Sequence, residues 1–198
     1  MTNDVRIRQM TVRDIYYAAK LHRDAIPGIS SHIGIAYLNN LYRVLALHPT
    51  LHLSFVAEKN QTVIGMITST YNRNKTKKKI NCITLSPYVV FNLLRAILLR
   101  KIRPRDVVNR LLYERELTQA IPNLQAAIFT LFVASNSQRA GVGTSLVQKI
   151  IQQCKMKGAK ELYVETGVNN EKAIAFYKKV GFKTVVKIRD IFVLKISL

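Results

Sequence analysis

The order of apolar and polar residues in the N-terminal part of the chain predicts short strands and two helices. These elements are, in chain order, a strand at 5–8, helices at 12–25 and 33–47, and strands at 53–57 and 62–71. The strands are indicated by alternation or by apolar runs, and the helices by apolar residues that recur every three to four positions. Polar residues 58–61 favour a hairpin between two strands. Gly65, inside the second of these strands, indicates a bulge or the close approach of another backbone.

The C-terminal part predicts a regular alternation of strands and helices. These elements are a strand at 126–133, a helix at 144–156, a strand at 162–165, a helix at 171–179, and strands at 182–187 and 191–196. The run from Ala126 to Val133 is almost uninterrupted apolar, which is typical of a strand buried on both faces. Gly158 follows the first of these helices, where a glycine commonly ends one. The whole pattern predicts an α/β fold with a mixed sheet.

Between the third and fourth predicted strands lies a segment, 72–123, that is longer than a simple connection. It opens with basic residues and continues with two helical patterns, at 89–101 and 106–117, separated by Pro104. Five apolar residues of the first pattern fall on one helical face: Val90, Leu93, Leu94, Ile97 and Leu98. A long insertion in a compact domain tends to be functional. Packing or dimerisation, a lid, and contact with a membrane or nucleic acid are all open roles.

The charge of the chain is strongly skewed towards basic residues. Its 198 residues, a length that fits one domain, include 31 Lys and Arg against 11 Asp and Glu, so the net charge is +20. Such a charge attracts anions, among them nucleic acid and acidic membrane surfaces. Cys82 and Cys154 form neither a disulfide framework nor a metal-like spacing. The longest apolar stretch is too short for a membrane span, and no signal peptide is visible, so we expect a cytoplasmic protein.

A glycine-containing turn, Ser137–Thr144, stands between a predicted strand and a predicted helix. Glycines at such a turn let the backbone approach a ligand, and the helix start behind them carries a partial positive charge. Arg139 adds a full charge that can bind phosphate oxygens. No Asp or Glu occurs between Glu116 and Glu161. The segment therefore favours a polyanionic ligand such as a pyrophosphate.

Two motifs in this region resemble those of the GNAT superfamily of N-acetyltransferases. The turn contains Gln138-x-x-Gly141-x-Gly143, which matches the family's Q/R-x-x-G-x-G/A acetyl-CoA motif. A second segment reads Asn170-x-x-Ala173-x-x-Phe176-Tyr177-x-x-x-Gly181-Phe182 and is similar to the family's N-x-x-A-x-x-F-Y-x-x-x-G-F pattern. The resemblance implies a single-domain acyl-CoA N-acyltransferase fold over 1–198. Its sheet is mixed, mostly antiparallel and flanked by helices, with 72–123 as a basic helical insertion.

The resemblance also implies where acetyl-CoA would bind and which residue would act as an acid. The pantetheine arm would pair with the main chain of Leu131, Phe132 and Val133. The pyrophosphate would lie on the glycine turn, formed by Gln138, Arg139, Ala140, Gly141, Val142, Gly143 and Thr144. Asn170 would either hydrogen-bond the cofactor or cap the last helix. Tyr177 would donate a proton to the departing thiolate of coenzyme A.

The reaction implied by the resemblance is direct transfer of an acetyl group to a neutral primary amine. Many relatives carry a glutamate on the strand that corresponds to Ala126–Val133, and this chain has none there. A base is instead expected among Glu165, His22, Asp24, His32 and an ordered water. Of these we predict Glu165, which would act together with Tyr177 as the catalytic pair. The acceptor is a small molecule or a peptide, and the chain could form a homodimer.

A second hypothesis is a non-catalytic member of the fold. In that case the basic insertion would bind an anionic surface, RNA or acidic lipid. Tyr177 favours the enzyme, whereas the missing strand glutamate favours the binding protein. Transfer to oxygen, or of a longer acyl chain, also stays open.

Overall fold

The computed structural model describes residues 5–25, 29–76, 80 and 86–198. In this part of the chain seven strands form one sheet in the order β1-β2-β3-β4-β5-β7-β6. The strands are β1 (Arg6–Gln9), β2 (His52–Lys59), β3 (Thr62–Thr70), β4 (Ala126–Val133), β5 (Glu161–Gly167), β6 (Lys183–Ile188) and β7 (Ile191–Ser197). Only β4 and β5 pair in parallel among these strands. The predicted α/β fold with a mostly antiparallel sheet is confirmed.

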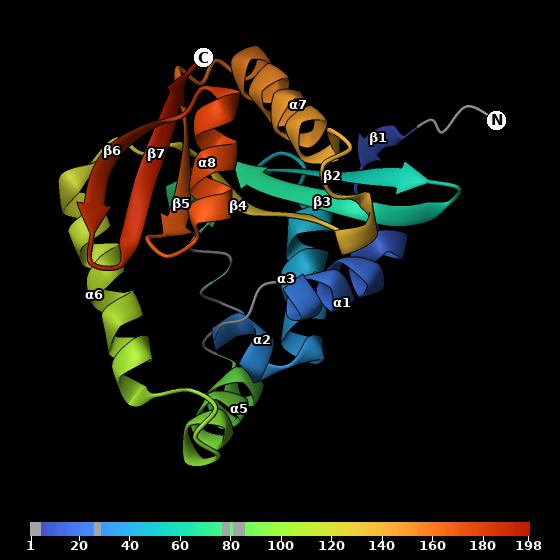
Figure 1. The fold of residues 1–198 in the computed structure, drawn as a ribbon. Coiled ribbons are helices and arrows are strands. Elements are labelled where there is room, and N and C mark those ends of the chain that lie inside the picture. The colour runs from blue at the N-terminus through green and yellow to red at the C-terminus, as the bar shows by residue number, and fades with distance from the viewer. Residues whose placement is uncertain (1–4, 26–28, 77–79, 81–85) are drawn as a thin grey trace.

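Helices cover both faces of this sheet (Figure 1). They are α1 (Ile15–Ala25), α2 (Ile29–Ile33), α3 (Ile35–Leu47), α5 (Pro87–Leu98), α6 (Pro104–Ala120), α7 (Val142–Met156) and α8 (Glu171–Val180). The single helix expected at 33–47 is wrong at its start, because α2 precedes α3 and Gly34 separates them. Gly34 has φ +119°, which breaks the helical path.

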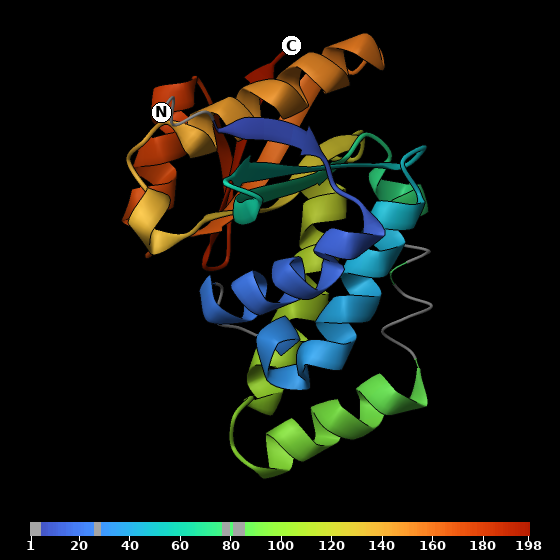
Figure 2. The ribbon, with the colours of Figure 1, turned by 90° about the vertical axis from the view of Figure 1, so that its right-hand side faces the viewer.

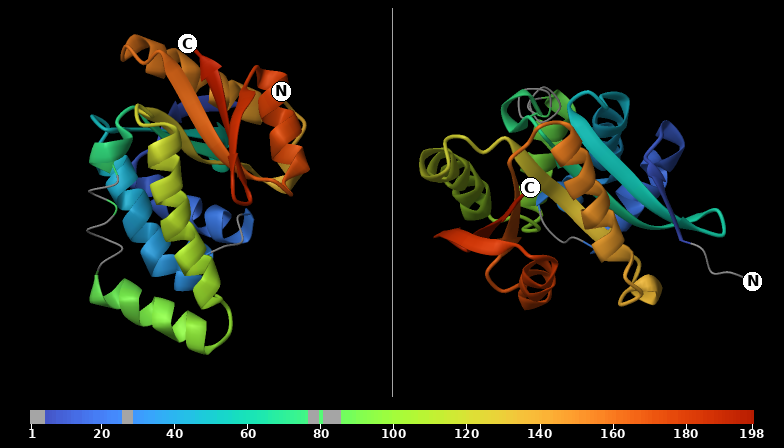
Figure 3. Two further views of the ribbon diagram at one scale, coloured as in Figure 1. Left: turned by 90° about the vertical axis from the view of Figure 1, so that its left-hand side faces the viewer. Right: turned by 90° about the horizontal axis from the view of Figure 1, so that it is seen from above.

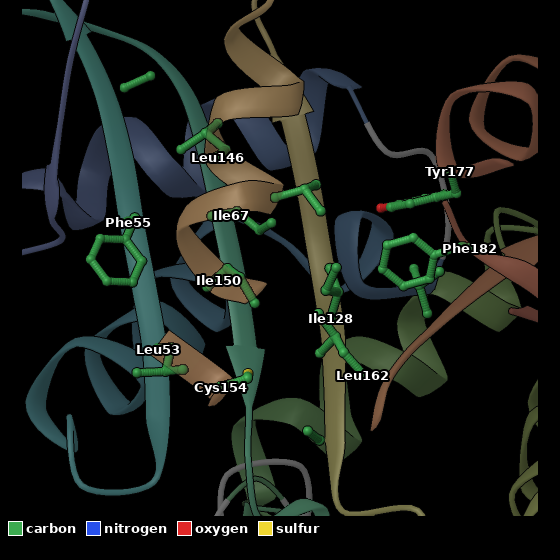
Figure 4. Packing of buried hydrophobic residues seen from close by; sticks show 14 of the residues in the cluster. Leu53, Phe55, Ile67, Ile128, Leu146, Ile150, Cys154, Leu162, Tyr177 and Phe182 are labelled. Atoms are coloured by element: carbon green, nitrogen blue, oxygen red, sulfur yellow. The ribbon is translucent and has the colours of Figure 1, made fainter. Parts of the chain in front are cut away.

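The largest core cluster lies between the sheet and the helices α7 and α8 (Figure 4). Leu146 and Ile150 of α7 are fully buried against Ile67 of β3 and Leu162 of β5. Burying one such side chain stabilises the fold by roughly 1.5–3 kcal/mol. Cys154 of α7 belongs to this cluster, and burial raises the pKa of its thiol to about 11. The thiol is therefore protonated and unreactive near neutral pH. Cys82 lies outside the described residues.

Two further clusters cover the opposite face of the sheet. Leu38 and Tyr42 of α3 pack with Met66 of β3, below the half of the sheet formed by β1–β4. The other half is covered by α6, whose Tyr113 and Leu117 pack beneath β5 and β7. The sheet is thus covered on both faces. On this face α3 covers one half and α6 covers the other.

Gly65 fulfils both sequence expectations. The β2–β3 register shifts beside it, since Ala57 pairs with Gly65 and Glu58 with Val63. A β-carbon at Gly65 would lie 3.2 Å from the carbonyl oxygen of Phe132 on β4. A side chain there would push β3 and β4 apart.

Helix α5 of the insertion lies at the end of the molecule farthest from the sheet (Figures 2 and 3). Helix α5 lies across this end and packs against α2, and α6 then runs back towards β6. The face of α5 predicted from its apolar residues is not the packed one, because Val89 and Ala96 are buried whereas Leu94 and Leu98 are exposed. In the part of the chain that is described, no helix is long and apolar enough to cross a membrane.

Candidate functional site

Strands β4 and β5 separate in the middle of the sheet. Their described pairing runs only from Ala126↔Leu162 to Ile128↔Val164, although β4 continues to Val133 and β5 to Gly167. Beyond this point β4 stays paired on its other edge with β3. In Figure 1 strands β2–β4 accordingly run roughly horizontally, whereas β5–β7 run roughly vertically. The separation leaves one edge of β4 open beside β5.

A bulge marks the position where β4 leaves β5. Thr68 of β3 pairs with Thr130 and Ser69 pairs with Ile128, so Phe129 is the extra residue of β4. A bulge bends its strand and disrupts the local ladder, and bulges often stand beside functional sites. Residues Phe129–Leu131 are partly exposed here, so the expectation of a strand buried on both faces holds only for the first half of β4.

The glycine turn forms the start of α7 next to the end of β4. Arg139 and Gly141 both have left-handed backbone angles, with φ +63° and +80°, and Gly141 is the N-cap of α7. The first N–H groups of a helix have no partner within it, and successive N–H groups in such a turn form a concave anion site. The first turn of α7 holds no acidic residue. The backbone thus has the geometry of an anion site, and anion binding at this turn stays a prediction.

The two motifs meet in space. A β-carbon at Gly143 would lie 3.5 Å from the ring of Phe176 on α8 and 3.8 Å from Val133 on β4. The side chain of Gln138 donates a 3.1 Å hydrogen bond to the carbonyl oxygen of Val133. The turn, the open end of β4 and α8 thus form one continuous surface.

Tyr177 of α8 is buried beside this surface, with its hydroxyl pointing towards β4 (Figure 4). Its ring packs edge-to-face with Phe176 and Phe182 at centroid distances of 5.2 and 5.4 Å. Burial raises the pKa of Tyr177 above its ordinary value. The hydroxyl therefore keeps its proton near neutral pH and can act as a donor.

Comparison with known proteins finds a family resemblance in the C-terminal part of the chain. The model of the acetyltransferase (GNAT) family matches residues 101–182, which include β4, the glycine turn and Tyr177. This part of the chain is therefore similar to an acetyltransferase (GNAT) domain. The match ends at Phe182, where the second motif ends.

Curated N-acetyltransferases align with about a third of this chain. An uncharacterized N-acetyltransferase of Methanocaldococcus jannaschii is 41% identical over 64 residues, which is 31% of this chain and 28% of the relative. An N-alpha-acetyltransferase of Sulfurisphaera tokodaii is 36% identical over 66 residues, which is 33% of this chain and 40% of the relative. The chain thus aligns with less than half the length of either relative.

The fold is shared over a longer range than the sequence. The crystal structure of the PaiA N-acetyltransferase from Thermoplasma acidophilum in complex with coenzyme A superimposes with a TM-score of 0.64 at 14% identity. The alignment covers 98% of this chain and 99% of that chain. At this identity the likeness concerns the fold alone, and it includes the region of the helical insertion.

Glu165, the expected base, follows Val164 on β5 at the point where β4 departs. Its carboxylate accepts a 2.7 Å hydrogen bond from Arg73 and lies 3.5 Å from Arg110 of α6. Both arginines also contact Glu114, at 3.2 Å for Arg73 and 2.6 Å for Arg110. Glu165 therefore belongs to a network of two carboxylates and two guanidinium groups. Arg73 is the buried centre of this network.

Sequence reasoning missed this network. Arg73 is the first of the basic residues in the insertion, and its charge alone predicts an exposed side chain. The sequence signal that could have indicated the network was the scarcity of acidic residues. A chain with only 11 Asp and Glu has few carboxylates with which a basic side chain can pair. The network places Glu165 and Tyr177 on opposite faces of the sheet, since Glu165 contacts α6 and Tyr177 packs with the cluster of α7.

The other expected bases lie in three different settings. His22 is buried, and its Nδ1 lies 2.6 Å from the hydroxyl of Tyr42. Tyr42 in turn hydrogen-bonds Thr130 at the open part of β4. Asp24 pairs with Arg23 at 3.2 Å, and His32 is exposed on α2. Of these three, only His22 is connected by described hydrogen bonds to β4.

Burial also sets the charge of His22. It lowers the pKa of the imidazole to about 4, so the ring is neutral near pH 7 and only weakly basic. Asn170, the remaining predicted site residue, caps α8 by accepting a 3.1 Å hydrogen bond from the N–H of Ala173. Within the described residues, no group of three or more His, Cys, Asp or Glu side chains is placed to hold a metal ion.

Proposed function

We propose that the chain is an acetyl-CoA-dependent N-acetyltransferase that passes an acetyl group directly to a primary amine of a small molecule or peptide. The observation that carries this proposal is the open edge of β4 between Phe129 and Val133, which lies beside the start of α7. We take 1–198 as one GNAT domain with 72–123 as its insertion. The coenzyme A complex of the Thermoplasma neighbour supports the same donor.

The residues present fit a donor that carries a pyrophosphate. The backbone from Arg139 to Thr144 offers N–H groups at a helix start, with Arg139 exposed at its rim. The main-chain groups of Leu131 and the N–H of Val133 can pair with the amides of a pantetheine arm, as an added strand would, whereas the Val133 carbonyl oxygen already accepts from Gln138. When bound, acetyl-CoA supplies the activated acetyl thioester. An N–H of the bulged strand near Phe129 could then stabilise negative charge on the thioester carbonyl oxygen.

Proton transfer is assigned to two residues on opposite faces of the sheet. Tyr177 holds a proton on the face of α7 and α8, where it can reach the departing thiolate. Glu165 stands on the face of α6, where an acceptor amine would approach. It can accept a proton from the amine only if its contact with Arg110 loosens, because two guanidinium groups hold its carboxylate.

The ion-paired Glu165 favours an acceptor amine whose pKa is low enough that much of it is neutral near pH 7. A lysine amine, with pKa about 10.4, costs about 4.6 kcal/mol to hold neutral at pH 7, whereas a peptide α-amine with pKa about 7.8 costs about 1 kcal/mol. His22 is weakly basic and Glu165 is ion-paired. We therefore place peptide α-amines ahead of lysine side chains. The name of the Sulfurisphaera relative, an N-alpha-acetyltransferase, supports this order.

The test is thiol release from acetyl-CoA with two peptide sets, one with free N-termini and one with blocked N-termini and internal lysines. We expect release with the first set and much less with the second, and product mass spectra should place the acetyl group on the α-amine. Glu165→Gln should lower the rate at pH 7 and lose less at pH 9, where the amine is already neutral. Thermal stabilisation by acetyl-CoA with no release for any amine would instead support the non-catalytic binding protein.

A further inference from the structure

The outer face of α5 is apolar. Phe91, Leu94 and Leu98 are 65%, 61% and 83% exposed. Their spacing of three and four residues places them on one side of the helix. Val89 and Ala96, which are buried, lie on the opposite side and face the molecule. The helix therefore carries two apolar faces, of which only one is used in the described fold.

We call this outer face the α5 stripe (Phe91, Leu94 and Leu98). Exposed basic side chains occur on α5 and in the residues directly after it, and we call them its border. The exposed border residues are Arg95, Arg100, Lys101, Arg103 and Arg105. Arg103 pairs with Asp106 at the start of α6. No acidic residue occurs in the sequence between Glu58 and Asp106. The stripe thus combines exposed apolar groups with a strongly positive rim.

This combination decides between three kinds of partner. A second copy of the chain would bury the stripe but would bring two positive rims together, on molecules that each carry a net charge of +20. Nucleic acid would satisfy the rim but would leave Leu94 and Leu98 exposed to water. An anionic lipid surface satisfies both, because the apolar groups enter the acyl boundary while the basic groups meet phosphate headgroups.

We propose that α5 is a docking helix that lies in the surface of a bilayer containing anionic lipid. Its position agrees with this role, since α5 lies across the end of the molecule farthest from the sheet (Figures 2 and 3). Only the stripe would enter the bilayer, because Val89 and Ala96 pack inwards. Docking would bring α2, which packs on α5, close to the lipid headgroups.

The first test is sedimentation of the full chain with vesicles of phosphatidylcholine and phosphatidylserine in a 3:1 ratio. We expect the chain to bind these vesicles and to bind pure phosphatidylcholine vesicles weakly or not at all. Binding to the mixed vesicles should fall in 1 M salt. Replacing the stripe by serine (Phe91→Ser, Leu94→Ser, Leu98→Ser) should weaken binding at least tenfold. Replacing three rim residues (Arg95→Gln, Lys101→Gln, Arg105→Gln) should weaken it roughly hundredfold, at about fivefold per charge.

Matched controls separate the stripe from general charge and stickiness. Met156→Ser removes an exposed apolar side chain at the end of α7. Lys155→Gln, Lys183→Gln and Lys187→Gln remove three exposed lysines elsewhere. Both controls should bind vesicles nearly as the parent chain does. Equal weakening by the rim and control lysine sets would overturn a dedicated docking helix.

A fluorescence reporter gives a readout that does not depend on loss of function. The chain contains no tryptophan, so Leu94→Trp creates a single reporter in the stripe. Its emission should shift to shorter wavelength with the phosphatidylserine vesicles and should be quenched by brominated lipid. An unshifted emission, a stripe-dependent dimer without vesicle binding, or a preference for single-stranded RNA over vesicles would each overturn the proposal.

Discussion

Arg73 donates a 2.7 Å hydrogen bond to Glu165, which lies 92 positions later in the chain. The bond joins the beginning of the insertion to β5 at the point where β4 and β5 separate. Arg110 of α6 contacts the same carboxylate. Ion pairs therefore hold the insertion against the edge of the proposed catalytic site.

Removing Arg73 should destabilise the fold strongly. Its side chain is only 6% exposed, and Arg73→Ala would leave Glu114 and Glu165 with Arg110 as their remaining cation in the network. Breaking a buried ion pair on one side typically costs 3–5 kcal/mol, so we expect a loss of about 3 kcal/mol in the free energy of unfolding. Urea denaturation measures it. Lys75→Ala, an exposed control from the same turn, should change little, and equal midpoints for both variants would contradict the network's role.

Tyr177→Phe should abolish most of the turnover without disturbing the fold. The phenyl ring keeps the edge-to-face contacts with Phe176 and Phe182, while the proton donor is lost. General acid catalysis contributes about 10²–10⁴-fold, so we expect kcat to fall by at least a hundredfold with donor affinity retained. Calorimetry with coenzyme A and steady-state kinetics separate the two effects. A variant with unchanged kcat would remove Tyr177 from the mechanism.

The two glycines of the turn should respond differently to alanine. Gly141 has φ +80°, so Gly141→Ala imposes backbone strain of roughly 1–2 kcal/mol even though open space surrounds the position. Gly143 has ordinary helical angles, and its added methyl group would rest 3.5 Å from Phe176. Coenzyme A affinity should therefore drop severalfold for Gly141→Ala and stay close to the parent value for Gly143→Ala. Similar affinities for both variants would show that the turn does not shape the binding site.

His22 should make the fold less stable in mild acid. Its pKa is about 4 in the folded chain, against 6.5 for an ordinary histidine. As the pH falls from 6.5 to 4, the unfolded chain takes up a proton that the folded chain does not, so stability decreases. The full difference is about 3 kcal/mol, at 1.36 kcal/mol per pH unit. Urea denaturation at pH 7 and pH 4.5 tests it, and His22→Gln should reduce the pH dependence. An unchanged dependence would place the acid sensitivity elsewhere.

Local spacing predicted the local structure around the proposed donor site. Gly141 begins α7, Asn170 caps α8 and Tyr177 lies on α8, because each depends on residues only a few positions away. The same reasoning correctly indicated the bulge and close backbone contact at Gly65. The assignments of these residues to donor binding and catalysis stay predictions.

Long-range pairing was beyond sequence reasoning. No periodicity links Arg73 to Glu165, since their contact depends on how the insertion folds back onto β5. The packed face of α5 could not be predicted either, because apolar residues occur all around the helix. Val89 is buried and Leu98 exposed only because α2 lies on one side.

The central claim is that the open edge of β4 and the start of α7 hold the donor. Hydrogen–deuterium exchange of the full chain with and without coenzyme A tests it most directly. The account predicts slower exchange of the amides in 129–133 and 141–144 when coenzyme A is bound, with Gly141→Ala weakening the effect. Saturating binding with no protection of either segment, or with protection confined to other strands, would contradict it.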